Sequence, residues 1–111
     1  MMTLDGLRSF GADVNDGLAR CMNNEAFYIK LVNMAVSGEG FAELSDALSK
    51  NDLKSAFEAA HKLKGVFANL SLTPLYKPTN ELTELLRHET PGDYQALLNE
   101  ILAQKARLEA L

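Results

Sequence analysis

Apolar residues recur every three or four positions from Leu53 to Leu70, and this spacing constrains the fold more than any other feature of the sequence. At about 100° per residue, these side chains fall on one face of a helix, which is centred near Ala60. The face contains the following residues: Leu53, Ala56, Phe57, Ala60, Leu63, Phe67 and Leu70. A helix that is apolar on one side must pack against other elements, so the pattern predicts a long helix in a helical core.

Helical spacing recurs along the rest of the chain, and no stretch shows the alternation that marks a strand. We expect further helices over residues 4–10, 16–22, 25–36, 41–50 and 74–88, and a final helix that runs to Leu108. The connections are short, which favours antiparallel packing of consecutive helices. The predicted fold is all-α: an antiparallel four-helix bundle with additional short N-terminal helices and a C-terminal helix, in a single domain over residues 1–111.

Polar caps and prolines mark the expected ends of these helices. Asn23-Asn24 and Asp52 are expected to cap the helices that follow them. Thr73-Pro74 predicts an N-cap followed by a proline in the first turn. Thr90-Pro91-Gly92-Asp93 repeats that signal, with the aspartate completing a variant of the capping box. Pro78 lies inside an expected helix, where it removes a hydrogen bond, and it predicts a kink or a restart.

Size and charge limit the classes of function. A chain of 111 residues with a net charge of −4 and no basic stripe does not fit a general nucleic-acid binder. Its one cysteine, Cys21, cannot form an internal disulfide. No apolar run has the form of a signal peptide or the length to span a bilayer, so no membrane association is expected. These features favour a cytoplasmic protein, and we expect a monomer.

His61 lies about 100° from the centre of the apolar face, so its imidazole is expected to point into solvent. Residues three and four positions apart share a helix face, which places six residues on one strip with it. They are Lys54, Phe57, Glu58, Lys64, Gly65 and Ala68. A glycine inside a helix costs about 1 kcal/mol relative to alanine. Gly65 beside an exposed imidazole therefore indicates that a partner approaches closely there.

The segment His61-Lys62-Leu63-Lys64-Gly65 resembles the H-x-L-K-G core motif of histidine-containing phosphotransfer (HPt) domains. The resemblance covers roughly residues 13 to 87. Its further matches are Ala60 before the motif and three leucines after it: Leu70, Leu75 and Leu82. The sequence departs from the family pattern at Val66 and Phe67, where small residues are usual, and at Ser71, where a glycine is usual.

The resemblance implies a phosphotransfer intermediate in a two-component phosphorelay. His61 would accept a phosphoryl group from the aspartate of a response-regulator receiver domain and pass it to another receiver. Lys64, one turn away, would favour the phosphoryl group electrostatically. Lys54, Phe57, Glu58, Gly65 and Ala68 would contact the partner, which is a receiver domain or a hybrid sensor histidine kinase. The receiver would supply Mg²⁺, and no cofactor, metal or nucleotide site is expected in this chain.

Three alternatives remain open at this point. The chain could be an HPt-like docking module that binds a regulator without carrying phosphate, which the departures at Val66, Phe67 and Ser71 would permit. It could be the dimeric phosphotransfer domain of a histidine kinase, although an acidic residue normally follows the histidine there, and Lys62 follows here. A helical metal protein fits poorly, because the chain has two histidines and lacks the pair of Glu-x-x-His motifs that such centres use.

Overall fold

The computed structural model describes residues 2–111, which contain seven α-helices and no strand. The helices are α1 (Leu4–Phe10), α2 (Val14–Arg20), α3 (Glu25–Ser37), α4 (Gly40–Ser49), α5 (Leu53–Asn69), α6 (Thr73–Arg87) and α7 (Tyr94–Glu109). The all-α prediction is confirmed. The helix expected at residues 16–22 begins two residues earlier, because Asp13 caps it through a hydrogen bond from the Asp16 backbone N–H.

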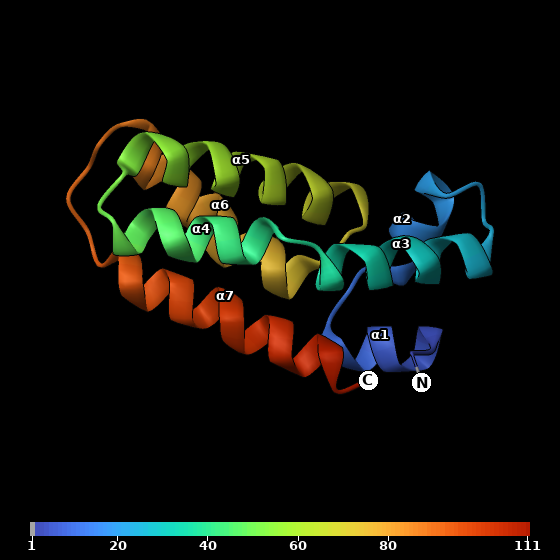
Figure 1. Ribbon diagram of the computed structural model, residues 1–111. Coiled ribbons are helices and arrows are strands. Elements are labelled where there is room, and N and C mark those ends of the chain that lie inside the picture. Colours follow the sequence, from blue (N-terminus) through green and yellow to red (C-terminus); the bar gives the residue numbers. More distant parts are fainter. Residues whose placement is uncertain (1) are drawn as a thin grey trace.

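Helices α4, α5, α6 and α7 lie side by side, and the chain runs back and forth through them (Figure 1). Helix α4 contacts α7 as well as α5, which closes the group. The C-terminal helix, predicted as an addition to a bundle, is therefore one of its members. The three N-terminal helices gather beyond one end of this group.

Helices α3 and α4 follow one another end to end instead of packing antiparallel (Figure 1). The three turns that reverse the chain each contain a residue in the left-handed region: Asn51 (φ 54°), Ser71 (φ 55°) and Glu89 (φ 51°). Such a residue commonly ends a helix and redirects the chain. Gly38, between α3 and α4, has φ −71° and ψ 165° and is extended. The antiparallel prediction is wrong at this junction because the reversing conformation is missing.

The apolar face predicted for α5 forms the centre of the core. Its members Ala56, Ala60, Leu63, Phe67 and Leu70 are buried, and Leu53 and Phe57 are half-buried. Apolar spacing does not ensure burial in α3, where the side chain of Phe27 is 41% exposed. Because α3 extends past the bundle, only one narrow face of it is covered.

The helix-start signals are confirmed at two positions and displaced at two others. Asn24 and Asp52 cap α3 and α5 through side-chain hydrogen bonds. Leu72, and not Thr73, occupies the N-cap position of α6, with no side-chain cap. Asp93 itself caps α7, accepting a 2.9 Å hydrogen bond from the Ala96 backbone N–H, so the cap predicted at Thr90-Pro91 is wrong. A carboxylate three residues before a free N–H satisfies that donor directly.

Helix α6 runs through Pro78 without a break, so the predicted restart is wrong. Pro78 is buried, and the core leucines Leu75, Leu82 and Leu86 hold the helix on both sides of it. The hydroxyl of Thr79 donates a 2.7 Å hydrogen bond to the Leu75 carbonyl within the same turns. Packing of the apolar face offsets the single hydrogen bond that the proline removes.

Two contacts fasten the N-terminal helices to the turn between α5 and α6. The backbone N–H of Asp13 donates to the Ser71 carbonyl at 3.0 Å. The buried Tyr28 hydroxyl donates to the Leu70 carbonyl at 2.8 Å, and burial raises the pKa of Tyr28 to about 12. Gly17 makes room for this tyrosine, because a Cβ atom there would lie 2.6 Å from its ring. These contacts fix the end of the helix that carries His61.

Candidate functional site

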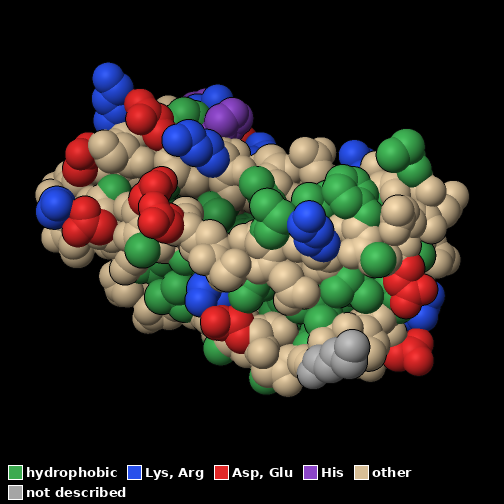
Figure 2. Space-filling view, turned by 45° about the vertical axis from the view of Figure 1, so that its right-hand side comes forward, with side chains coloured by type: hydrophobic (Ala, Val, Ile, Leu, Met, Phe, Trp, Pro, Cys, Tyr) green, Lys and Arg blue, Asp and Glu red, His purple; other side chains and the backbone are tan. Residues whose placement is uncertain are grey.

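His61 projects from the middle of α5, and its side chain is exposed, as the helical spacing predicted. The neighbouring Ala60 and Leu63 are buried in the bundle, so the backbone beneath the imidazole is held by the core. Figure 2 shows histidine side chains at the molecular surface with lysine and arginine side chains beside them. The arrangement presents an accessible imidazole on a rigid helix.

An aromatic stack orients the imidazole. The rings of Phe57 and His61 lie 5.7 Å apart between centroids, at an interplanar angle of 19°. The guanidinium carbon of Arg87, on α6, lies 5.0 Å from the centroid of the Phe57 ring. Cations favour such positions near the face of an aromatic ring. The sequence prediction missed Arg87, because the register of α6 against α5 is set by tertiary packing.

Lys64 is paired with an acidic residue that the sequence prediction also missed. Its ammonium lies 3.4 Å from a carboxylate oxygen of Glu84 on α6. The other oxygen of Glu84 lies 3.1 Å from Arg87 and 3.8 Å from His88. Partial burial raises the pKa of Glu84, but the charge of Arg87 and the hydrogen bond from Lys64 outweigh it, so the pKa lies below its usual value. Glu84 therefore stays ionised at neutral pH and holds both cations near the His61 strip.

The remaining residues of the strip face solvent. Lys54, Glu58, Gly65 and Ala68 are exposed, and Phe57 is half-buried. A Cβ atom built on Gly65 would meet no atom within 4 Å outside the backbone of its own helix. Nothing inside the protein therefore requires a glycine at this position. At 1.5 Å per residue, the strip from Lys54 to Ala68 is about 21 Å long.

The departures from the family pattern have structural explanations away from the imidazole. Phe67 is buried against Phe41, with ring centroids 5.8 Å apart, and Val66 is 39% exposed on another side of α5. Ser71 takes the left-handed conformation that a glycine would adopt, and its hydroxyl donates to a carboxylate oxygen of Asp16. This hydrogen bond, followed by that from Arg20, lowers the pKa of Asp16.

Hydrophobic side chains also reach the surface on the half of the molecule built by the N-terminal helices (Figure 2). Met22, Phe27 and Met34 are the large exposed side chains there. Over residues 2–111, no helix is long and apolar enough to cross a membrane. The same residues contain no group of three or more histidine, cysteine or acidic side chains that could hold a metal ion.

In a comparison with known protein families, residues 35–111 match the model of the Hpt domain. The match begins inside α3, includes His61 and Lys64, and continues through α7. The match shares residues 35–87 with the predicted resemblance over residues 13 to 87, and it extends beyond that prediction to residue 111. Comparisons with curated proteins and with solved structures gave no match.

Proposed function

The chain belongs to the Hpt domain family, and on that premise we propose that it carries phosphoryl groups on His61 between receiver domains of a phosphorelay. One observation supports the choice of residue above all others. His61 is an exposed imidazole on a rigid helix, with Lys64 one turn away and open space at Gly65. The other histidine, His88, lies in the C-cap of α6 outside the family motif.

The proposed transfer needs a nucleophile from this chain and an activated phosphoryl group from the partner. A neutral ring nitrogen of His61 attacks the phosphorus of the receiver's aspartyl phosphate. A phosphorus–nitrogen bond forms, the bond from phosphorus to the aspartate oxygen breaks, and the carboxylate leaves with the electron pair. The other ring nitrogen releases its proton to solvent. Transfer to a second receiver reverses these steps, and the receiver's acidic pocket holds the Mg²⁺.

Lys64 is proposed to stabilise the negative charge that the phosphoryl group brings to the strip. In the unphosphorylated protein its ammonium is 3.4 Å from Glu84, so the phosphoryl oxygens compete with this carboxylate for it. Glu84 also pairs with Arg87, which leaves it a second cation when Lys64 turns away. The ion pair therefore keeps the lysine near His61 before transfer.

The partner is proposed to lie along the strip on α5. Lys54, Phe57, Glu58, Gly65 and Ala68 would form the contact surface around the imidazole. We propose that the chain acts as a monomeric carrier in the cytoplasm, in a single domain. Response-regulator receivers and a hybrid sensor histidine kinase are the candidate partners, and this chain supplies no nucleotide site or cofactor.

The test is phosphoryl transfer between purified components. The chain is incubated with ³²P-labelled receiver domains and Mg²⁺, and acid-labile, base-stable phosphate on the chain is followed. The wild type and a His88→Gln control should take the label, and His61→Gln should not. If receivers that bind the chain label neither the wild type nor the control, the chain is a docking module and the proposal is wrong.

A further inference from the structure

Two hollows of opposite charge lie at the two ends of the His61 strip. The first, called here the basic hollow, has a volume of about 370 Å³ and is lined by Leu53, Lys54, Phe57, Leu86, Arg87 and Glu89. The second, called here the acidic hollow, has a volume of about 220 Å³ and is lined by Asp13, Asp16, Phe67, Ala68, Ser71, Thr73 and Tyr76. Each contains a residue of the strip, so a partner that covers His61 along α5 meets both.

The basic hollow adjoins the imidazole directly. Phe57 forms part of its wall and stacks on His61, and Arg87 lies over the same ring. Lys54 is exposed at this hollow and has no ion pair among residues 2–111. Arg87 is already paired with Glu84 at 3.1 Å, so Lys54 is the cation that this hollow offers to a partner. The leucine and phenylalanine side chains of the hollow provide an apolar surface for the aliphatic part of the partner's side chain. The hollow suits an acidic side chain.

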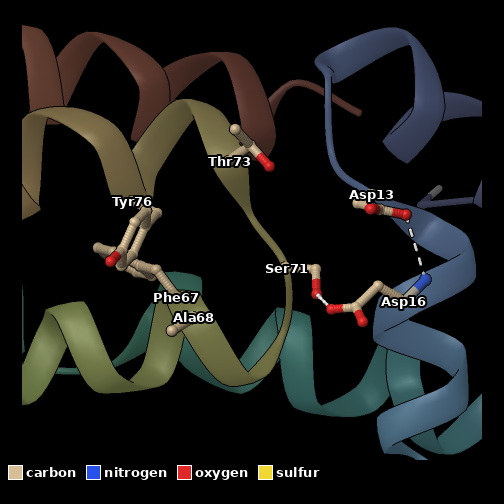
Figure 3. A pocket seen from close by; sticks show the side chains of 7 residues that line it. All are labelled: Asp13, Asp16, Phe67, Ala68, Ser71, Thr73 and Tyr76. Atoms are coloured by element: carbon tan, nitrogen blue, oxygen red, sulfur yellow. Dashed lines mark hydrogen bonds between the residues drawn. The ribbon is translucent and has the colours of Figure 1, made fainter.

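The acidic hollow lies between α2 and the start of α6. Figure 3 shows the carboxylates of Asp13 and Asp16 on one side and Tyr76, Phe67 and Ala68 on the other, with Ser71 between. Asp16 is engaged by Ser71 and by Arg20, whose guanidinium is 2.9 Å away.

The carboxylate of Asp13 is available to a cationic side chain of a partner. One of its carboxylate oxygens accepts the Asp16 backbone N–H at 3.2 Å, and none of the ion pairs among residues 2–111 includes it. A lysine or arginine could lay its aliphatic stem on Tyr76 and place its charge at Asp13.

The spacing of the two hollows matches one docked domain. Phe57 and Ala68 are eleven residues apart on one helix, which is about 16 Å. A standard protein interface covers about 800 Å² on each partner, or a round patch about 32 Å across. A single receiver centred near His61 therefore reaches both hollows.

We propose that these hollows fix the orientation of the receiver, which places an acidic side chain in the basic hollow and a basic side chain in the acidic hollow. This inference rests on the proposed function, because it takes the receiver as the occupant. Asp13 is the N-cap residue of α2 and Asp16 lies in its first turn, so both are outside residues 35–111 of the family match. The acidic hollow thus gives this chain a means of selecting receivers that the matched part of the family does not encode.

The test compares variants that remove one charge from a hollow with control variants that remove the same charge elsewhere on the surface. Asp13→Asn keeps a side chain that can cap α2, and Asp5→Asn makes the same change on α1. Lys54→Gln is matched by Lys30→Gln on α3. The dissociation constants of receiver domains are measured by calorimetry at low and high salt. In parallel, labelling of His61 is measured from the receivers and from phosphoramidate, a small donor that needs no docking.

Each hollow variant should weaken receiver binding about threefold at low salt, and the double variant about tenfold, while both controls bind like the wild type. Labelling by phosphoramidate should match the wild type in both control variants. Unchanged receiver binding in both hollow variants would overturn the inference and leave the phosphotransfer function standing. Receiver binding that depends on both hollows, without label on His61, would support the docking surface and remove the proposed function.

Discussion

Substitution of Gly65 should move stability and function in opposite directions. The added Cβ of Gly65→Ala meets open space, so the folded state pays no steric cost. Alanine is better than glycine inside a helix by about 0.5–1 kcal/mol. For 111 residues, an unfolding entropy of about 2.1 cal/mol/K per residue amounts to about 0.23 kcal/mol/K. The melting temperature should therefore rise by about 2–4 °C.

Gly65→Gln extends the same change into the space that a docking receiver needs. It should keep part of the gain in helix stability but slow labelling of His61 by a receiver about tenfold, which corresponds to about 1.4 kcal/mol. Labelling by phosphoramidate should change less than twofold, because this donor does not cover the strip. The assays are thermal unfolding by circular dichroism and the two labelling rates.

Gly17→Ala is the matched stability control. Its Cβ would lie 2.6 Å from the Tyr28 ring, so overpacking should outweigh the helix preference and lower the melting temperature. The reasoning about Gly65 would be refuted if Gly65→Ala destabilised the fold, since that would mean the glycine serves the protein's own packing. Equal receiver labelling of Gly65→Gln and the wild type would refute the steric role.

Three further substitutions test the contacts around the site. Glu84→Gln should slow receiver labelling of His61 about two- to threefold in stopped-flow assays, because the ion pair no longer holds Lys64 near His61; faster labelling would show that the carboxylate only competes with the phosphoryl group for the lysine. The lowered pKa of Asp16 means that its stabilising contribution is present above the unfolded pKa, near 3.8, and is lost as the pH falls through the folded pKa. Ser71→Ala should therefore lower the urea midpoint at pH 7, and this loss should shrink as the pH falls below 3.8; an equal loss at every pH would contradict this. Tyr28→Phe should cost about 1 kcal/mol in urea unfolding. With the pKa of Tyr28 raised to about 12, the stability that this group contributes should be present below pH 10 and be lost between about pH 10 and 12, so an unfolding midpoint that is flat across that range would argue against it.

The sequence was sufficient to predict the strip on α5 because that prediction depends on one helix. The 3.6-residue period alone places Phe57, Lys64 and Ala68 beside His61. Arg87 and Glu84 lie beside the same strip but belong to α6. Their position next to it depends on the axial register in which α6 packs against α5. No local pattern encodes that offset, so these two residues emerge only from the packed structure.

The errors at helix ends and in α3 have the same origin. Thr90 and Asp93 are both good N-cap residues, and the choice between them depends on where α7 meets the bundle. Phe27 has the spacing of a core residue, but its side chain lies on a part of α3 that no other element covers. Periodicity identifies apolar side chains without showing whether another element covers them.

Ser71 and helix α2 depend on each other. A serine in the left-handed region carries a conformational cost that a glycine avoids. Here the Ser71 hydroxyl donates a hydrogen bond to Asp16, and the Ser71 carbonyl accepts one from the Asp13 N–H. Both polar groups of the serine are therefore hydrogen-bonded to α2 or its N-cap. Without α2 the serine would keep the cost and lose both partners. The serine in place of the family's usual glycine is therefore coupled to a helix outside the matched region, and this coupling places Asp13 beside the Ala68 end of the His61 strip.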